Sequence, residues 1–178
     1  MRRLFFLFLV LSLNSFSQTA EEYFNRGISK AELGDHTGAI ADYTNAIKLS
    51  PKYIGAYNNR GNSKAKLGDH TGAIVDYTKA IELHSDETVY LTSIFIYPEF
   101  AGIYFNRGIS KANLGDLTGA FADFTKAIEL DPENGGAYYD RGQIKYDLKD
   151  YIGACEDWTK AGELGIAIAY EMRKKHCQ

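Results

Sequence analysis

Histidine and cysteine are the side chains of this sequence best suited to acid–base, nucleophilic or metal chemistry. They stand at His36, His70, His84, His176, Cys155 and Cys177. No histidine belongs to a recognisable set of nucleophile, base and carboxylate, so all four are interpreted as surface residues. A phosphate-binding loop, a nucleophile elbow and a zinc motif are also missing from the sequence. We therefore expect a protein that is not an enzyme and holds no metal or cofactor.

The two cysteines leave two interpretations open. They are too few for a zinc site or for the disulfide framework of a small secreted domain, each of which needs about four or more. Cys155 takes the place of Ile40 and Ile74 in similar segments, which suits a small core residue. A Cys155–Cys177 disulfide is chemically allowed after export, but the spacing alone does not show that the two residues meet.

The charge of the chain excludes one class of partner. Hydrophobic residues make up 45% of the sequence and charged residues 24%, as in ordinary globular proteins. Lysine and arginine total 20 against 23 acidic residues, a net charge of -3, whereas proteins that bind nucleic acid carry a basic excess. We expect a folded domain with no nucleic-acid partner.

Residues 1–17 have the order of a secretory signal peptide. Two arginines precede the apolar stretch 4–13, and small or polar residues follow it. Ser15 and Ser17 place small side chains at the positions that favour cleavage before Gln18. The apolar stretch is too short to span a bilayer and no longer one follows, so we expect an exported protein, periplasmic or extracellular, without an integral membrane span. An uncleaved anchor helix is the alternative.

A five-residue pattern recurs four times in the rest of the chain. The copies are YFNRG at 23–27, YNNRG at 57–61, YFNRG at 104–108 and YYDRG at 138–142. Gly27 and Gly61 are 34 residues apart, and so are Gly108 and Gly142, whereas Gly61 and Gly108 are separated by one such period plus 13 residues. The sequence is a 34-residue repeat with one insertion.

Each copy has the pattern of two helices joined by a turn. Leu-Gly-Asp, or Leu-Lys-Asp in the last copy, follows the glycine by six residues and ends the first helix. In the second helix alanine and aromatic residues recur at helical spacing, as at Ala39, Tyr43 and Ala46 in the first copy. Because neither helix buries its apolar face alone, consecutive hairpins must stack.

The copies resemble the tetratricopeptide repeat, whose fourth, eighth, twentieth, twenty-fourth, twenty-seventh and thirty-second positions are characteristic. The first copy fills these positions with Tyr23, Gly27, Ala39, Tyr43, Ala46 and Pro51. The resemblance gives repeats at 20–53, 54–87, 101–134 and 135–168, an insertion at 88–100 and a short capping helix at 169–178. It implies an all-α, right-handed superhelical solenoid of helix-turn-helix repeats with a concave groove. Ser85 and Ile166 replace the proline in the second and fourth repeats.

Charged residues at positions 7 and 11 depart from the usual pattern of the family. Position 7 holds Arg26, Arg60, Arg107 and Arg141, and position 11 holds Lys30, Lys64, Lys111 and Lys145. An aspartate matches each arginine at position 23, at Asp42, Asp76, Asp123 and Asp157. Positions 7 and 23 approach each other in an antiparallel hairpin, which predicts one arginine–aspartate bridge per repeat. The alternative is that the row of arginines recruits an acidic partner.

The resemblance also implies a binding groove, lined by first-helix positions such as 5, 6 and 9. The candidate partner-binding residues there are Phe24, Asn25, Asn58, Asn59, Asn62, Phe105, Asn106 and Tyr139, with Asp140 and Gln143 at positions 6 and 9 of the fourth repeat. In some members of the family, position-6 asparagines hold the backbone of an extended peptide, because an amide both donates and accepts hydrogen bonds. The alternative is that these asparagines only face solvent. Phe24 and Ile28 replace the basic clamp of the chaperone-binding members.

The 13 extra residues lie within His84 to Tyr97 and are mostly apolar or aromatic. They either lengthen the second helix of the second repeat and fold back on the solenoid, or form a docking surface. We expect a non-catalytic scaffold or adaptor that binds a peptide or another protein in its groove. The alternatives are an accessory subunit of an envelope enzyme or transport complex, and a structural solenoid that self-associates through the insertion.

Overall fold

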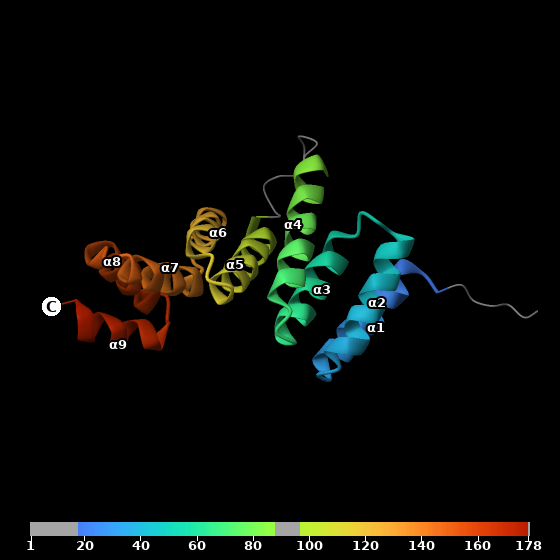
Figure 1. The fold of residues 1–178 in the computed structure, drawn as a ribbon, viewed down its shortest axis with the longest axis horizontal. Helices are drawn as coiled ribbons and strands as arrows, with labels where there is room; N and C mark the ends of the chain where they lie inside the picture. The colour runs from blue at the N-terminus through green and yellow to red at the C-terminus, as the bar shows by residue number, and fades with distance from the viewer. Residues whose placement is uncertain (1–17, 88–96, 178) are drawn as a thin grey trace, which may run out of the picture.

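The computed structural model describes residues 18–87 and 97–177, and all regular structure within them is helical. The helices are α1 (Ala20–Glu32), α2 (His36–Leu49), α3 (Ile54–Lys66), α4 (His70–Glu87), α5 (Tyr97–Asn113), α6 (Leu117–Leu130), α7 (Gly135–Asp147), α8 (Tyr151–Glu163) and α9 (Ala167–His176). They stack in chain order as antiparallel pairs, with α1 and α9 at opposite ends of an elongated solenoid (Figure 1). The predicted all-α solenoid is confirmed. The proposed signal peptide, 1–17, lies outside the described residues.

A tight turn joins the two helices of each pair. Gly34, Gly68 and Gly115 adopt φ of 81°, 82° and 82° after the first helix, a conformation that glycine reaches without steric cost, and Lys149 adopts 67° in the fourth repeat. The next residue, an aspartate, caps the second helix. The cap aspartates accept a hydrogen bond from a backbone N–H three residues later, at 2.8–3.0 Å, through Asp35, Asp69, Asp116 and Asp150.

Each pair packs closely because a glycine of the first helix lies under an aromatic ring of the second. A Cβ atom built on Gly61 would lie 2.8 Å from the ring of Tyr77, and the same contact joins Gly142 to Trp158. The rings themselves are almost fully buried, with Tyr77 at 1% and Trp158 at 0% exposure. This close approach gives every repeat its own part of a continuous core.

The insertion lengthens the helices on both sides of it. Helix α4 has 18 residues and α5 has 17, against 13 or 14 for the other paired helices. The last four residues of the predicted insertion 88–100 belong to α5. The others, 88–96, lie outside the described part. Phe100 and Ile103 of α5 pack in one cluster with Tyr77, so the third repeat stacks directly on the second.

The capping helix α9 begins at Ala167, two residues before the predicted start. Gly165, with φ of 90°, ends the preceding turn and sets this earlier start. A disulfide between Cys155 of α8 and Cys177 holds the end of α9, with the two Cα atoms 5.7 Å apart. No helix of the described part is long and apolar enough to cross a membrane.

Candidate partner-binding groove

A buried aspartate in each second helix is held by two cations of the first helix. In the second repeat, Arg60 donates from Nε and Nη2 to the two carboxylate oxygens of Asp76, at 2.9 and 2.7 Å. Lys64 Nζ lies 2.8 Å from Asp76 Oδ2, and the aspartate side chain is only 1% exposed. The other repeats have the same trios, Arg26–Asp42–Lys30, Arg107–Asp123–Lys111 and Arg141–Asp157–Lys145.

The predicted arginine–aspartate bridge is thus confirmed, while the lysine partner was not predicted. The arginine and lysine together hold the pKa of Asp42 low, at about 2, chiefly through the Arg26 hydrogen bond. The recurrence of lysine at position 11, one helical turn after each arginine, was the signal in the sequence that could have revealed the second partner.

The internal arginines also join neighbouring repeats. Arg60 and Arg107 each donate from Nη1 at 3.1 Å to a threonine hydroxyl of the preceding repeat, Thr44 and Thr78. Arg141 makes the same contact with Thr125 at 3.4 Å. Because their donors are committed inside the protein, these arginines serve the fold and are not presented to an acidic partner.

The first helices line one face of the solenoid, and a hollow of about 420 Å³ lies between α3 and α5 on this face. Asn62 and Asn106 meet there, with Asn106 Nδ2 donating to Asn62 Oδ1 at 3.1 Å. The Tyr77 hydroxyl donates to the same oxygen at 2.8 Å. The Asn62 Nδ2 donor and the Asn106 Oδ1 acceptor have no hydrogen-bond partner among the described residues. This pair matches the hydrogen-bonding needs of an extended peptide backbone.

A second hollow, between α5 and α7, is rich in hydrogen-bond acceptors. Asp140, Asp147, Asn113 and Gln143 line it. Asp140 has no ion-pair partner within the described ranges, and burial raises the pKa of its carboxyl to about 6. The Gln143 Oε1 atom is buried without a hydrogen-bond partner. These groups favour a ligand that supplies N–H donors or a positive charge.

The predicted aromatic site residues lie elsewhere, in the packing between repeats. The ring of Phe24 stands 4.7 Å from that of Tyr53 and contacts Gly55 of the next repeat. Phe105 contacts Gly136 in the same way, and Tyr139 packs in the cluster around Trp158. These rings are half-buried spacers between repeats.

The remaining predicted asparagines are spread along the first helices. Asn25 is exposed, whereas Asn58 is half-buried with its Oδ1 atom lacking a partner. Burial raises the pKa of the Tyr43 hydroxyl, and the Asn59 side chain lowers it in part. Ser110 and His70, which line the hollow beside Asn62, were not predicted as site residues.

The stacked hairpins, their glycine–aromatic contacts and the groove define a helical-repeat protein. Family models described as TPR repeat and tetratricopeptide repeat match residues 27–68, 55–87 and 101–134, together more than half of the chain. The chain belongs to the tetratricopeptide-repeat family. The fourth repeat lies beyond these matches. Its structure identifies it as a repeat of the same kind, because Arg141, Asp157 and Lys145 form the same trio of charges as in the other three repeats.

Solved structures share the fold. MamA from Desulfovibrio magneticus RS-1, residues 41 to the end, is 23% identical over 82% of this chain and 75% of that chain, with a TM-score of 0.68. The first TPR of Spaghetti (RPAP3) bound to the HSP90 peptide SRMEEVD is 23% identical over 75% of this chain and 95% of that chain, with a TM-score of 0.64. The APC/C hetero-tetramer Cut9–Hcn1 is 16% identical over 90% of this chain and 30% of that chain, with a TM-score of 0.77. No curated protein matches the chain.

Proposed function

We propose that this protein is a non-catalytic interaction module that binds an extended segment of another protein along the inner face of α3, α5 and α7. The observation that carries the proposal is the Asn62–Asn106 pair, which offers one unused donor and one unused acceptor in the first hollow. The Spaghetti repeat domain of similar fold is bound to a peptide, which supports this use of the face.

The second hollow adds a preference for the ligand. Asp140 and Gln143 Oε1 are acceptors without partners, and the two hollows share Ile109 in their walls. A peptide that follows the groove from one hollow to the next would present its backbone to the asparagines and a donor, such as a lysine side chain, to Asp140. At pH values below the pKa of Asp140 the carboxyl is protonated and neutral, so this preference for positive charge is lost.

We further propose that the protein works outside the cytoplasm. The signal-like order of residues 1–17 supports export, and so does the Cys155–Cys177 disulfide, because disulfides persist in oxidising compartments. An accessory role in an envelope complex fits the same binding face. Self-association through His84 to Tyr97 stays a prediction that the molecular mass at several concentrations tests.

A selection from a random peptide library tests the groove. Peptides selected on the protein are measured by calorimetry against the Asn62→Ala/Asn106→Ala variant, for which we expect at least tenfold weaker binding. Asn45→Ala is the matched control, because Asn45 lies on a second helix, α2, and lines neither hollow. Selected peptides that bind the double variant as tightly as the wild type would place the binding face elsewhere.

A further inference from the structure

Helix α9 repeats the pattern of the first helices. Ala169, its third residue, is fully buried against the preceding repeat, as Ala137 is in α7. Tyr170 and Arg173 follow at the spacing of Tyr138 and Arg141, and the guanidinium carbon lies over the tyrosine ring at 5.1 Å in α9 and 5.6 Å in α7. The capping helix is therefore the first helix of a fifth repeat.

The face of α9 that a second helix would cover is open. In the four complete repeats the tyrosine of this pair is half-buried and the arginine meets an aspartate of the second helix. Within residues 18–87 and 97–177 no helix lies opposite α9, Tyr170 is 55% exposed, and Arg173 has no acidic partner. Among the described residues, this side of α9 therefore has no counterpart of the carboxylate that faces the arginine in the other repeats.

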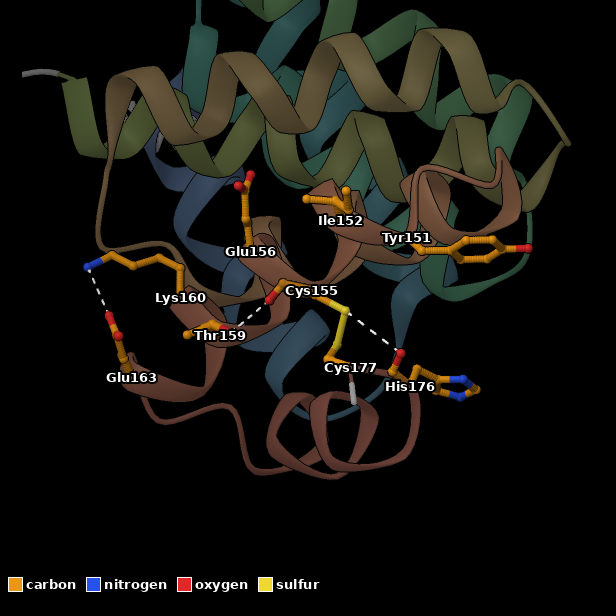
Figure 2. Close-up of a pocket in the computed structure, with 9 residues that line it drawn as sticks. All are labelled: Tyr151, Ile152, Cys155, Glu156, Thr159, Lys160, Glu163, His176 and Cys177. Atoms are coloured by element: carbon orange, nitrogen blue, oxygen red, sulfur yellow. Dashed lines mark hydrogen bonds and ion pairs between the residues drawn. A yellow bond between two sulfur atoms is a disulfide. The ribbon is translucent and has the colours of Figure 1, made fainter.

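The neighbouring face of α8 differs from that of the other repeats, because it gains an apolar side chain at Ile152 and a carboxylate at Glu156, in the place of Ala41, Val75 and Ala122. Ile152 is 78% exposed and takes the place of Thr37, Thr71 and Thr118, and Tyr151 beside it is 52% exposed. Both residues line a hollow of about 700 Å³ that His176 and Cys177 close on the α9 side. Figure 2 shows the disulfide joining the two helices at this hollow, so the face is held in a fixed shape.

We propose that this end of the solenoid, formed by α8 and α9, docks one amphipathic, acidic helix of a partner protein against the face that a second helix covers in the complete repeats. The four complete repeats show what covers such a face, a helix whose carboxylate meets the arginine. Arg173 and Lys174 supply the complementary positive charge on the α9 side of this face. The proposal concerns a surface separate from the groove and does not depend on it.

The structure also constrains the sequence of the partner helix. Lys174 takes the place of the glycine that lies under an aromatic ring in the complete repeats. A side chain at this position would collide with such a ring, because a Cβ atom built on Gly27 lies 2.6 Å from the ring of Tyr43. The partner helix therefore carries a small residue in place of the aromatic. All four second helices of the described chain are already packed in their own repeats, so a second intact copy does not supply the helix.

A labelled peptide made from the protein's own second helix is a direct probe. The peptide is residues 35–50 with Tyr43→Ala, titrated to millimolar protein by fluorescence anisotropy with the disulfide intact. We expect saturable binding that falls at least tenfold when the peptide also carries Asp42→Asn, and a similar loss with Arg173→Gln in the protein. The peptide that retains Tyr43 should bind more weakly than the probe.

Two protein variants separate docking from folding. Ile152→Thr restores the threonine of the other repeats and should weaken binding severalfold without lowering the unfolding midpoint. Lys126→Gln, an exposed cation on α6, should change nothing. Absence of saturable binding, equal binding of the Asp42→Asn peptide, or a dimer that forms with rising concentration and blocks the peptide would overturn the proposal. Loss of groove binding in the Asn62→Ala/Asn106→Ala variant does not contradict this docking proposal.

Discussion

At the scale of single residues, the aspartate between two cations decides how a repeat holds together. Its buried carboxylate is neutralised by an arginine that makes two hydrogen bonds and by a lysine, and the same arginine reaches the preceding repeat. A buried charge of this kind is costly when its partners are removed, much more than an exposed pair. The trio is therefore the place where a single substitution has its largest effect.

Replacing Asp157 by alanine should lower the free energy of unfolding by about 3–5 kcal/mol. The reason is that Arg141 and Lys145, which both lie within 2.9 Å of its carboxylate oxygens, would be left half-buried without a counter-charge. Urea unfolding measures the change. Glu163→Gln is the control, because its ion pair with Lys160 is exposed and contributes less than about 1 kcal/mol. An unchanged midpoint for Asp157→Ala would show that the trio is not stabilising.

Asp140 should make the protein less stable as the pH rises from about 4 to about 6. Burial raises its pKa to about 6 in the folded state, against about 3.9 in the unfolded chain, so the folded state binds more protons in this interval. The Asp140→Asn variant, which restores the asparagine of the other repeats, lacks this titration. Its free energy of unfolding should therefore fall by about 1–2 kcal/mol less over this pH interval, a value that allows for the partial exposure of Asp140 to solvent. Identical pH profiles of unfolding for the two proteins would contradict the buried, unpaired carboxyl.

At the scale of the helices, sequence spacing was sufficient for the hairpins and insufficient for the contacts between them. The 34-residue period, the turn residues and the alanine–aromatic spacing are local features, and they place α1 to α8 in pairs. The lengthened α4 and α5 depend on how repeats two and three stack, and that packing involves Phe100 and Ile103, which the repeat pattern does not specify.

The candidate site was predicted in part for the same reason. Asn62 and Asn106 are both predicted groove residues, but they occupy different repeat positions, 9 and 6, and their contact depends on the rotation between neighbouring repeats. Phe24 and Phe105 were expected in the groove. The glycine at position 2 of the next repeat, Gly55 or Gly136, leaves room for each ring between the helices instead.

The disulfide should control how firmly α9 is held. Reduction, or Cys177→Ser, removes a crosslink between residues 22 apart in the sequence and should cost on the order of 3 kcal/mol. Hydrogen exchange should then become faster in α9 and at the end of α8. The hydrogen bond between Tyr146 and His176, at 3.0 Å, would remain as a local tether. Equal exchange in the oxidised and reduced forms would show that packing alone holds the helix.

At the scale of the whole molecule, the same interface is repeated along the solenoid. An arginine–threonine hydrogen bond crosses each boundary between repeats, and the boundary that carries the insertion also has the Asn62–Asn106 bond and the cluster around Phe100. In a stack of this kind the stability is the sum of the repeats and of the interfaces between neighbours. Interfaces of similar make-up favour unfolding as one unit.

Two probes of one urea titration test this cooperativity. Trp158, the single tryptophan of the chain, is fully buried in the fourth repeat and reports on that end, whereas far-ultraviolet circular dichroism reports on all helices. We expect the two transitions to coincide in the wild type. Thr78→Val, which removes the hydroxyl that accepts from Arg107 across the boundary between the second and third repeats, should shift both curves together by about 1–2 kcal/mol. Thr71→Val, at an exposed position of α4, is the control. A fluorescence transition separate from the dichroism transition in the wild type would show that the end of the solenoid around Trp158 unfolds independently of the rest.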